Sequence, residues 1–330
     1  FPFTERLSLQ AGLRYTHEKK DFSQFVIRSD SQRSLFLPIN PFTGAVDTSN
    51  VSVPSSACSD LKNEGTFFTC HSSWNELSPR VSLNFQWTPD VFAYAQISRG
   101  FRSGGMNGRP TNISLIQDYK PEHLNSAEVG LKTLFADRRV RLNTAAFYNQ
   151  YEDMQVLLTR GTTIVIANAA EATVYGVEMD LEAALTSAWS MRASVGYVHN
   201  EYDKWRDDLG DYTWRRLRNA PEWTANLGTT YDLPLANAAH LRFGASVAYL
   251  SSMYLDGENS PVLHAPSRTL VDASVFYVAP DDRWEIGIQG SNLTDKRVLN
   301  SGYNALQFFG YAEGYYNPPR RYWLTYRYRI

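Results

Sequence analysis

The sequence predicts an all-β protein whose antiparallel strands run up and down through a membrane. Apolar and polar residues alternate with a period of two along most of the chain, whereas the 3.6-residue period of amphipathic helices is almost absent. Short and long connections follow each other in strict alternation. Aromatic residues make up 14% of the 330 residues, and on the apolar face they gather near both ends of the predicted strands.

About twelve strands are predicted, and the alternation is clearest from the middle of the chain onward. In residues 175–183, Tyr, Val, Met, Leu and Ala form one face, and Gly, Glu, Asp and Glu form the other. The same pattern runs through residues 189–197, 223–231, 241–249 and 322–330. Each segment therefore has one apolar and one polar face, as in a strand whose two sides meet different surroundings. In chain order the predicted strands are residues 4–19, 76–88, 91–102, 124–136, 139–157, 169–185, 188–203, 220–233, 240–253, 267–279, 284–298 and 320–330.

The connections predict an up-and-down meander with two unlike ends. Proline, aspartate and other turn-forming residues occupy the short connections, at residues 88–91, 136–139, 185–188, 234–239 and 280–283. The long connections are residues 20–75, 103–123, 158–168, 204–219, 254–266 and 299–319. Because short and long connections alternate, all tight turns lie at one end of the sheet and all long loops at the other.

The aromatic residues of the apolar face form two rows. Those beside the short turns are Trp87, Phe135, Trp189, Tyr231, Tyr277 and Trp284. Those beside the long loops are Tyr15, Tyr148, Tyr175, Tyr197, Trp223, Tyr249 and Tyr322. Eight residues separate Trp223 from Tyr231, which is about 20 Å for strands that rise about 3.3 Å per residue with a tilt of about 40°. Two aromatic rows that flank an apolar band are typical of an outer-membrane barrel, whereas a soluble β-sandwich or propeller would have a polar exterior.

Charge and composition exclude other classes of protein. Lys and Arg number 32 and Asp and Glu number 34, so the formal charge of −2 argues against nucleic-acid binding. No stretch of 18 apolar residues predicts a transmembrane helix. The chain opens on Phe1-Pro2-Phe3 without a methionine or a leader pattern, so we expect it to begin after a signal peptide or within a longer chain.

Residues 98–109, Ser-Arg-Gly-Phe-Arg-Ser-Gly-Gly-Met-Asn-Gly-Arg, resemble a signature of the TonB-dependent outer-membrane receptors. Four further segments are similar to strands of that family, and they occur in the family's order: residues 124–132, 174–178, 291–297 and 318–330. The resemblance covers the whole chain. One departure is Ile330, because the family usually ends in phenylalanine.

The resemblance implies a 22-stranded barrel closed by an N-terminal plug, of which a short segment contacts TonB. Only about twelve strands are predicted here, with neither plug nor TonB-contacting segment. Residues 1–330 are therefore interpreted as the C-terminal part of such a barrel, and a complete small barrel is the alternative. The implied location is the bacterial outer membrane, crossed many times, with the long loops extracellular.

The implied function is TonB-dependent active uptake of a scarce nutrient, with a ferric siderophore as the first hypothesis. Uptake of haem, cobalamin or an oligosaccharide is the alternative within this class, and a small passive porin is the alternative of another class. The implied partners are TonB, through a segment not present here, the small ligand, and outer-membrane lipid and lipopolysaccharide. No enzyme, cofactor or metal site is predicted, because the six histidines show no catalytic or metal-binding spacing.

Arginine and aromatic residues of the long loops are the candidate ligand-binding residues, because they suit a planar or anionic ligand. They are Arg102, Trp205, Arg206, Trp214, Arg215, Arg216, Arg218, Phe308, Phe309, Tyr311, Tyr315 and Tyr316. Packing between loops and contact with lipopolysaccharide are the alternative role of these residues. Three aspartates in residues 204–219 reduce the positive field of that loop.

Two further predictions concern a loop bridge and the polar face. Cys58 and Cys70, twelve residues apart in the longest loop, are expected to form a disulfide on an oxidising cell surface. The charged residues of the polar face are expected to form ion pairs in a hydrated wall, and a substrate path along that wall is the alternative. They are Glu128, Lys132, Glu178, Asp180, Glu182, Arg192 and Arg242.

Overall fold

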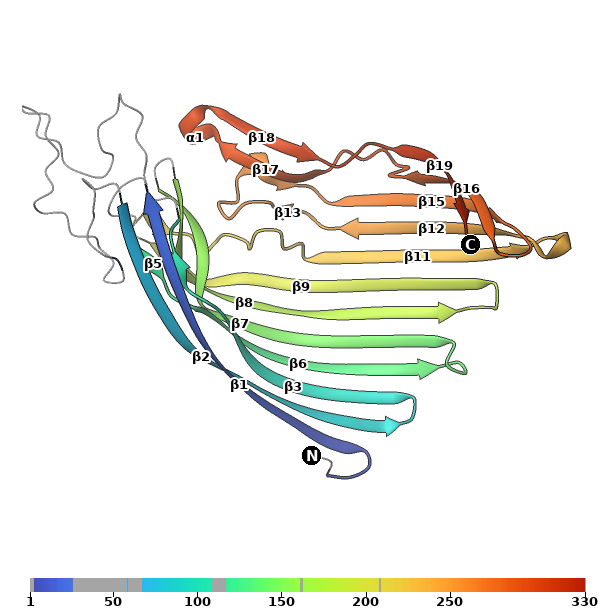
Figure 1. Ribbon diagram of the computed structural model, residues 1–330, viewed down its shortest axis with the longest axis horizontal. Helices are drawn as coiled ribbons and strands as arrows, with labels where there is room; N and C mark the ends of the chain where they lie inside the picture. The colour runs from blue at the N-terminus through green and yellow to red at the C-terminus, as the bar shows by residue number, and fades with distance from the viewer. Residues whose placement is uncertain are drawn as a thin grey trace, which may run out of the picture.

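The computed structural model describes residues 3–25, 58, 67–108, 117–160, 163–207 and 209–329. Twelve strands form one curved antiparallel sheet in which each strand pairs with its neighbours in chain order (Figure 1). The strands are β1 (Leu7–Phe25), β2 (Phe67–Thr88), β3 (Val91–Arg102), β6 (Glu122–Phe135), β7 (Val140–Arg160), β8 (Thr163–Ala184), β9 (Trp189–Asp207), β11 (Trp223–Pro234), β12 (His240–Leu250), β15 (Arg268–Val278), β16 (Trp284–Ser291) and β19 (Arg321–Tyr328).

The presence and order of twelve strands and the five tight turns are confirmed, although several strand ends differ from the prediction. In the turn between β6 and β7, residues Ala136, Asp137 and Arg138 have φ values of 52°, 55° and 62°, a left-handed run that reverses the chain within a few residues. The turn between β11 and β12 contains the short helix η2 (Ala236–Ala238). All these turns lie at one end of the sheet (Figure 1).

Two predicted long loops were too long, because the strands extend beyond the apolar band. β1 continues to Phe25 and β2 begins at Phe67, inside the predicted loop 20–75. β7 and β8 likewise enter the predicted loop 158–168. These extensions lie beyond the apolar band, and Val156, Leu158 and Val165 there are buried in a cluster of their own. The contrast between a lipid face and a water face, which produces the signal of period two, is therefore lost while the backbone ladder continues.

The predicted strand 284–298 is also wrong in its second half. β16 ends at Ser291, because Asn292 and Asp295 both adopt a φ of 50°. The Asn292 side chain then closes a tight turn: its Oδ1 accepts a hydrogen bond from the Lys296 amide and its Nδ2 donates to the Lys296 carbonyl, both at 2.9 Å. A local side-chain bond thus replaces the ladder.

The predicted loops near the opposite end contain short elements of their own. β4 (Gly105–Met106) pairs with β5 (Asp118–Tyr119), and β10 (Gly210–Asp211) folds back to pair antiparallel with the end of β9. β13 (Met253–Tyr254) pairs with β14 (His264–Ala265), which follows the short helix η3 (Pro261–Leu263). The predicted loop 299–319 is a hairpin: β17 (Leu299–Ala305), the one-turn helix α1 (Leu306–Phe309) and β18 (Tyr311–Tyr316). Figure 1 shows this hairpin beyond the end of β15, on the side opposite the tight turns.

The apolar face of the sheet is exposed. Leu13 is 70% exposed and Leu324 is 69% exposed, and most other large apolar residues of this face are open as well. Aromatic rings contact each other across strands in both predicted rows, for example Tyr197 and Trp223 at 4.8 Å and Tyr277 and Trp284 at 5.4 Å. A single layer with one open apolar face between two aromatic rows is suited to lipid rather than water.

The opposite, polar face carries ion pairs. Arg192 lies 3.8 Å from Glu182, which also binds Arg141. Near the tight turns the carboxylate of Glu285 is almost fully buried between the guanidinium groups of Arg242, at 3.7 Å, and Arg327, at 2.5 Å. Paired charges on this face agree with the predicted hydrated wall.

The sheet is open. Among the described residues β1 pairs only with β2 and β19 pairs only with β16, so closure into a barrel is not seen. No helix among the described residues is long and apolar enough to cross a membrane.

Candidate ligand-binding loops

Three long connections meet at the end of the sheet opposite the tight turns: residues 208–222, 251–267 and 292–320. They follow β9, β12 and β16 (Figure 1). Nine of the predicted binding residues lie in them, and Trp205 and Arg206 lie in the last three residues of β9, next to the first connection. Arg102 does not belong to this group, because β6, β7 and β8 separate its strand, β3, from β9.

Hydrogen bonds from an asparagine side chain and from the backbone join the first connection to the second. Asn259 accepts a hydrogen bond from the Arg216 amide at 2.7 Å and donates one to the Arg216 carbonyl at 3.0 Å. The Asn219 amide donates to the Tyr254 carbonyl at 2.8 Å. Asn259 thus copies the paired bonds of a β-ladder with its side chain, which fixes the two connections to each other.

Apolar packing joins the second connection to the third. Leu255, Leu263, Ala265 and Leu299 form a buried cluster. A Cβ atom at Gly302 would lie 2.4 Å from the end of the Leu263 side chain and 2.5 Å from the Glu313 carbonyl oxygen, so this position needs glycine for close approach. The three connections therefore form one unit, which also contains the hairpin of β17 and β18.

Trp205 is a packing residue and not part of an open binding surface. It is 1% exposed and lies in a buried cluster that spans β7, β8 and β9. This corrects the prediction, which placed Trp205 among the residues that meet the ligand. The reason is that β9 continues to Asp207, so Trp205 belongs to a paired strand rather than to a loop.

Most of the predicted cations are already engaged. The Arg215 guanidinium lies over the rings of Tyr212, Trp205 and Trp214, at 4.2, 5.1 and 5.6 Å. Such cation–π contacts hold a guanidinium in place by the charge distribution of the ring face. Arg215 therefore fastens its loop, whereas Trp214 remains 71% exposed.

The neighbouring arginines differ in their partners. Arg206 binds Asp211 at 2.9 Å and Arg216 lies 3.6 Å from Glu222. Hydrogen bonds from Thr213, and then the charge of Arg206, hold the pKa of Asp211 below its usual range, so this carboxylate stays ionised. Arg218 is exposed and has no ion-pair partner in the described part of the chain. It is the predicted cation best placed to meet an anionic group.

The hairpin of β17 and β18 has one aromatic face. Its register pairs Ser301 with Tyr315, Tyr303 with Glu313 and Ala305 with Tyr311, so all three tyrosines share one side. The glycines of the other side pack against Leu263 and Leu299. Tyr315 is 60% exposed, and Phe309 on α1, whose ring centre lies 6.2 Å from that of Tyr311, is 59% exposed. We call Tyr303, Phe309, Tyr311 and Tyr315 the tyrosine face.

The remaining aromatic predictions have different surroundings. Tyr316 lies on the glycine side of the hairpin, where the Arg297 guanidinium lies 4.5 Å from its ring. The side chain of Phe308 lies outside the described residues. The Tyr315 hydroxyl donates to Glu313 at 3.1 Å, and this bond raises the pKa of Tyr315, so its phenol remains neutral in neutral solution. Tyr315 therefore offers a ring and a hydroxyl group rather than a phenolate.

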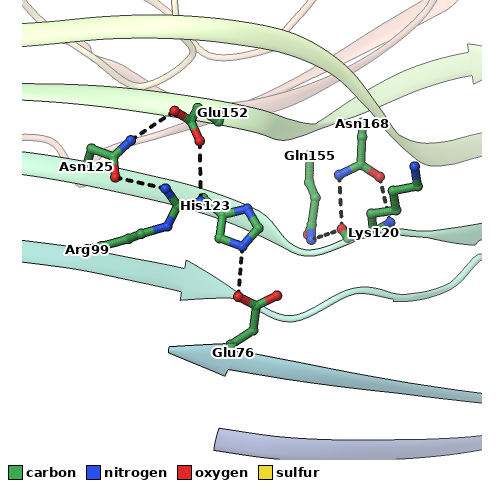
Figure 2. A network of polar contacts seen from close by, with 8 residues as sticks. All are labelled: Glu76, Arg99, Lys120, His123, Asn125, Glu152, Gln155 and Asn168. Carbon is green, nitrogen blue, oxygen red and sulfur yellow. Dashed lines mark hydrogen bonds and ion pairs between the residues drawn. The ribbon is translucent and has the colours of Figure 1, made fainter. Parts of the chain in front are cut away.

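A second polar network joins β2, β3, β6, β7 and β8 toward the end of the sheet opposite the tight turns (Figure 2). Gln155 and Asn168 fix the connection between β3 and β6, because both amides donate to the Lys120 carbonyl at 3.0 Å. His123 contacts Glu76 at 2.9 Å, and both side chains are largely buried. Most of these side chains either bind backbone groups of the connection or pair with each other. We therefore interpret the network as a support for the loop.

Two further contacts lie near the longest predicted loop, residues 20–75. A disulfide joins Cys58 to Cys70 on β2. Lys20 on β1 donates to the Gly104 carbonyl at 2.8 Å and lies over the Trp74 ring at 5.6 Å. The structure thus shows the predicted disulfide, and it adds a lysine that the sequence did not single out.

Sequence reasoning missed Asn259 as the residue that joins two loops. Its only signal is an asparagine among other turn-forming residues, which usually indicates a turn alone. Tyr303 is a further aromatic residue of the loop 299–319 that the sequence proposes for binding. The period of two within residues 299–316, once recognised as a hairpin, places it beside Tyr311 and Tyr315.

Comparison with known sequences gives the family of this fold. The family model "TonB dependent receptor-like, beta-barrel" matches residues 1–293. The PiuA receptor of Acinetobacter baumannii is 26% identical over 260 residues, which are 75% of this chain and 34% of that protein. The pesticin receptor of Yersinia pestis is 24% identical over 237 residues, which are 70% of this chain and 33% of that receptor. The chain therefore spans about a third of the length of these curated relatives.

Solved structures agree with this comparison. The ferric yersiniabactin uptake receptor FyuA from Yersinia pestis matches with a TM-score of 0.74 and 20% identity, over 99% of this chain and 43% of that one. The siderophore receptor PiuA from Acinetobacter baumannii matches with a TM-score of 0.69 and 19% identity, over 98% and 41%. At these identities the likeness shows the fold.

Proposed function

Because this chain belongs to the TonB-dependent receptor family and matches its β-barrel over residues 1–293, we propose that it forms part of the barrel wall of an outer-membrane receptor that takes up a ferric siderophore. Proteins of this family are receptors and transporters of the outer membrane. The names of two similar proteins support the choice of ligand, since one is a siderophore receptor and the other a ferric yersiniabactin uptake receptor.

The observation that carries this proposal is the two-faced sheet. Its exposed apolar face lies between two aromatic rows, and its other face carries ion pairs such as Arg242 with Glu285. Such a sheet suits a wall with lipid outside and water or protein inside. Its two edge strands, β1 and β19, have unpaired backbone groups that hydrocarbon does not tolerate. We therefore propose that further strands complete it to a 22-stranded barrel that encloses a plug.

The proposed ligand surface is the tyrosine face together with Trp214 and Arg218. Exposed rings offer stacking to a planar ligand, and Arg218 offers one charge-assisted contact to an anionic group. In this arrangement the long loops are extracellular and the tight turns periplasmic. TonB is the proposed partner that drives the uptake.

Uptake by cells that carry the full-length receptor tests the proposal. We expect transport of radioactive iron from at least one purified ferric siderophore, lost on deletion of the receptor gene and also on dissipation of the proton gradient. Uptake of only haem, cobalamin or an oligosaccharide would contradict the siderophore assignment. Uptake that persists without the gradient would indicate passive diffusion, as through a porin, and would contradict active transport.

A further inference from the structure

The aromatic row beside the long loops is interrupted on β2, β3 and β6. Cross-strand pairing places Tyr148 beside Tyr175, and Tyr175 beside His199, with ring centres 6.4 and 4.9 Å apart. In the other direction the same row continues through the pairs Tyr148–Ala127, Ala127–Ile97 and Ile97–Val81. Rings therefore give way to aliphatic side chains at the level where aromatic residues normally meet lipid headgroups.

A hollow of about 410 Å³ lies in this gap on the apolar face. Ala127 is exposed at its floor, and the walls include Ile97, which is 62% exposed, and Tyr148. Pro79 and Val81 line it from β2. Small side chains between larger ones thus leave an apolar depression in a surface that is otherwise ridged with leucine, valine and aromatic residues.

Polar side chains border the hollow on the side of the long loops. One row further along the strands, Arg99 pairs with Asn125, and Asn125 pairs with Gln150. Figure 2 shows Arg99, Asn125 and Glu152 in mutual contact, with Arg99 lying 3.3 Å from the Asn125 amide oxygen and 3.4 Å from Glu152. The two Arg99 distances are at the long end of the hydrogen-bond range, whereas the Asn125 amide donates to one Glu152 oxygen at 3.0 Å. The side chains of Arg99 and Glu152 are 39% and 51% exposed. Both charged groups can therefore still bind a ligand.

We infer that this hollow is a specific lipid site, which holds an acyl chain against Ala127 and a phosphosugar headgroup against Arg99, Asn125 and Glu152. The apolar floor and the polar border have the same order as the chain and headgroup of a lipid whose headgroup faces the long loops. A guanidinium donates to phosphate, and a carboxylate with an amide accepts from sugar hydroxyl groups. A border with both a cation and an anion suits such a mixed headgroup better than a purely anionic one.

The choice of occupant rests on the proposed function, because that function places the long loops outside the cell. The outer leaflet of the outer membrane consists of lipopolysaccharide, whose acylated and phosphorylated glucosamines carry both phosphate and hydroxyl groups. The inferred occupant of the hollow is therefore lipopolysaccharide. If the loops faced the periplasm, the hollow would instead meet glycerophospholipid.

The test is co-purification of lipid with the full-length receptor from outer membranes. After extensive detergent washing, hydroxylated fatty acids of lipopolysaccharide and glycerophospholipids are quantified per receptor by mass spectrometry. Ala127→Trp fills the hollow, Arg99→Gln removes the cation, and Arg99→Lys restores the charge without the fork of the guanidinium. Ala225→Trp is the matched control, because Ala225 lies on the same face between Val195 and Tyr249, where the aromatic row is intact.

We expect about one lipopolysaccharide per wild-type receptor. Retention should be at least about ten-fold weaker in Ala127→Trp and Arg99→Gln, intermediate in Arg99→Lys, and unchanged in Ala225→Trp. Wild-type receptor without retained lipopolysaccharide, or equal retention in all variants, would overturn the inference. Retention of glycerophospholipid in place of lipopolysaccharide would also overturn it. Resistance of the folded barrel to unheated SDS shows that each variant has folded. Iron uptake in the same cells reports on transport separately, so either proposal can fail without the other.

Discussion

Arg215 and Arg218 lie three residues apart in one loop, yet their surroundings predict opposite effects of substitution. Arg215 is held by three aromatic rings, whereas Arg218 is exposed without an ion-pair partner in the described residues. The sequence showed a group of arginines but not which of them was engaged, because that depends on where β9 ends and on which rings surround each guanidinium.

We expect Arg218→Gln to weaken binding of an anionic ferric chelate by about two- to five-fold at low salt, with little loss at high salt. One exposed charge contributes roughly 0.3–1 kcal/mol, and salt screens it. Arg215→Gln should instead accelerate proteolysis of the loop, with any loss of binding independent of salt. Binding to purified full-length receptor at two salt concentrations measures both effects. A stronger salt dependence for Arg215→Gln than for Arg218→Gln would contradict these roles.

Tyr315 is predicted to act through its ring. Its hydrogen bond to Glu313 raises its pKa, so the phenol stays protonated up to and beyond its ordinary titration range near pH 10. Tyr315→Phe should therefore keep chelate binding within about two-fold, and Tyr315→Leu should weaken it by about five-fold or more. The contribution of Tyr315 should not change between pH 6 and pH 9. An equal loss in both variants would assign the binding to the hydroxyl group instead.

At the scale of elements, the sequence predicted the strands inside the apolar band and failed where they leave it. Residues 223–231 alternate because one face meets lipid and the other water, and β11 lies where predicted. No such contrast exists beyond Lys20 or in the β17–β18 hairpin, so strands there looked like loops. The joining of three loops could not be predicted either, because it depends on Asn259 and Leu263 meeting segments remote in sequence.

Asn259 should control the rigidity of this unit. Asn259→Gly keeps the left-handed backbone, whose φ is 56°, but removes two hydrogen bonds to Arg216. At about 1 kcal/mol for each bond, local opening should become about ten- to thirty-fold more frequent. Hydrogen exchange of peptides from residues 251–267 measures this opening. Asn237→Gly is the control, because Asn237 has a φ of 71° in a tight turn at the other end of the sheet. Equal exchange in both variants would show that the clamp is not needed.

For the whole molecule, the one-layer sheet explains why so few residues form a conventional core. Described buried clusters lie only among the extensions and loops, around Trp205 and around Leu263, whereas the apolar residues of the band are exposed. Stability of the band must therefore come from lipid contact and from the backbone ladder. The same division assigns the two ends of the sheet different tasks, with tight turns at one end and a rigid, aromatic unit at the other.

This division leads to a prediction of orientation. Antiparallel strands place every tight turn on one side of the membrane, and outer-membrane barrels keep their short turns in the periplasm. A cysteine at Leu209, which is 65% exposed beside β10, should react with a membrane-impermeant biotin maleimide on intact cells. A cysteine at Asp137, in the turn between β6 and β7, should react only after the outer membrane is permeabilised. The native cysteines form a disulfide and should give little background. Labelling of Asp137→Cys but not Leu209→Cys on intact cells would reverse the orientation, and the tyrosine face would then lie in the periplasm, where it could not receive a ligand from outside.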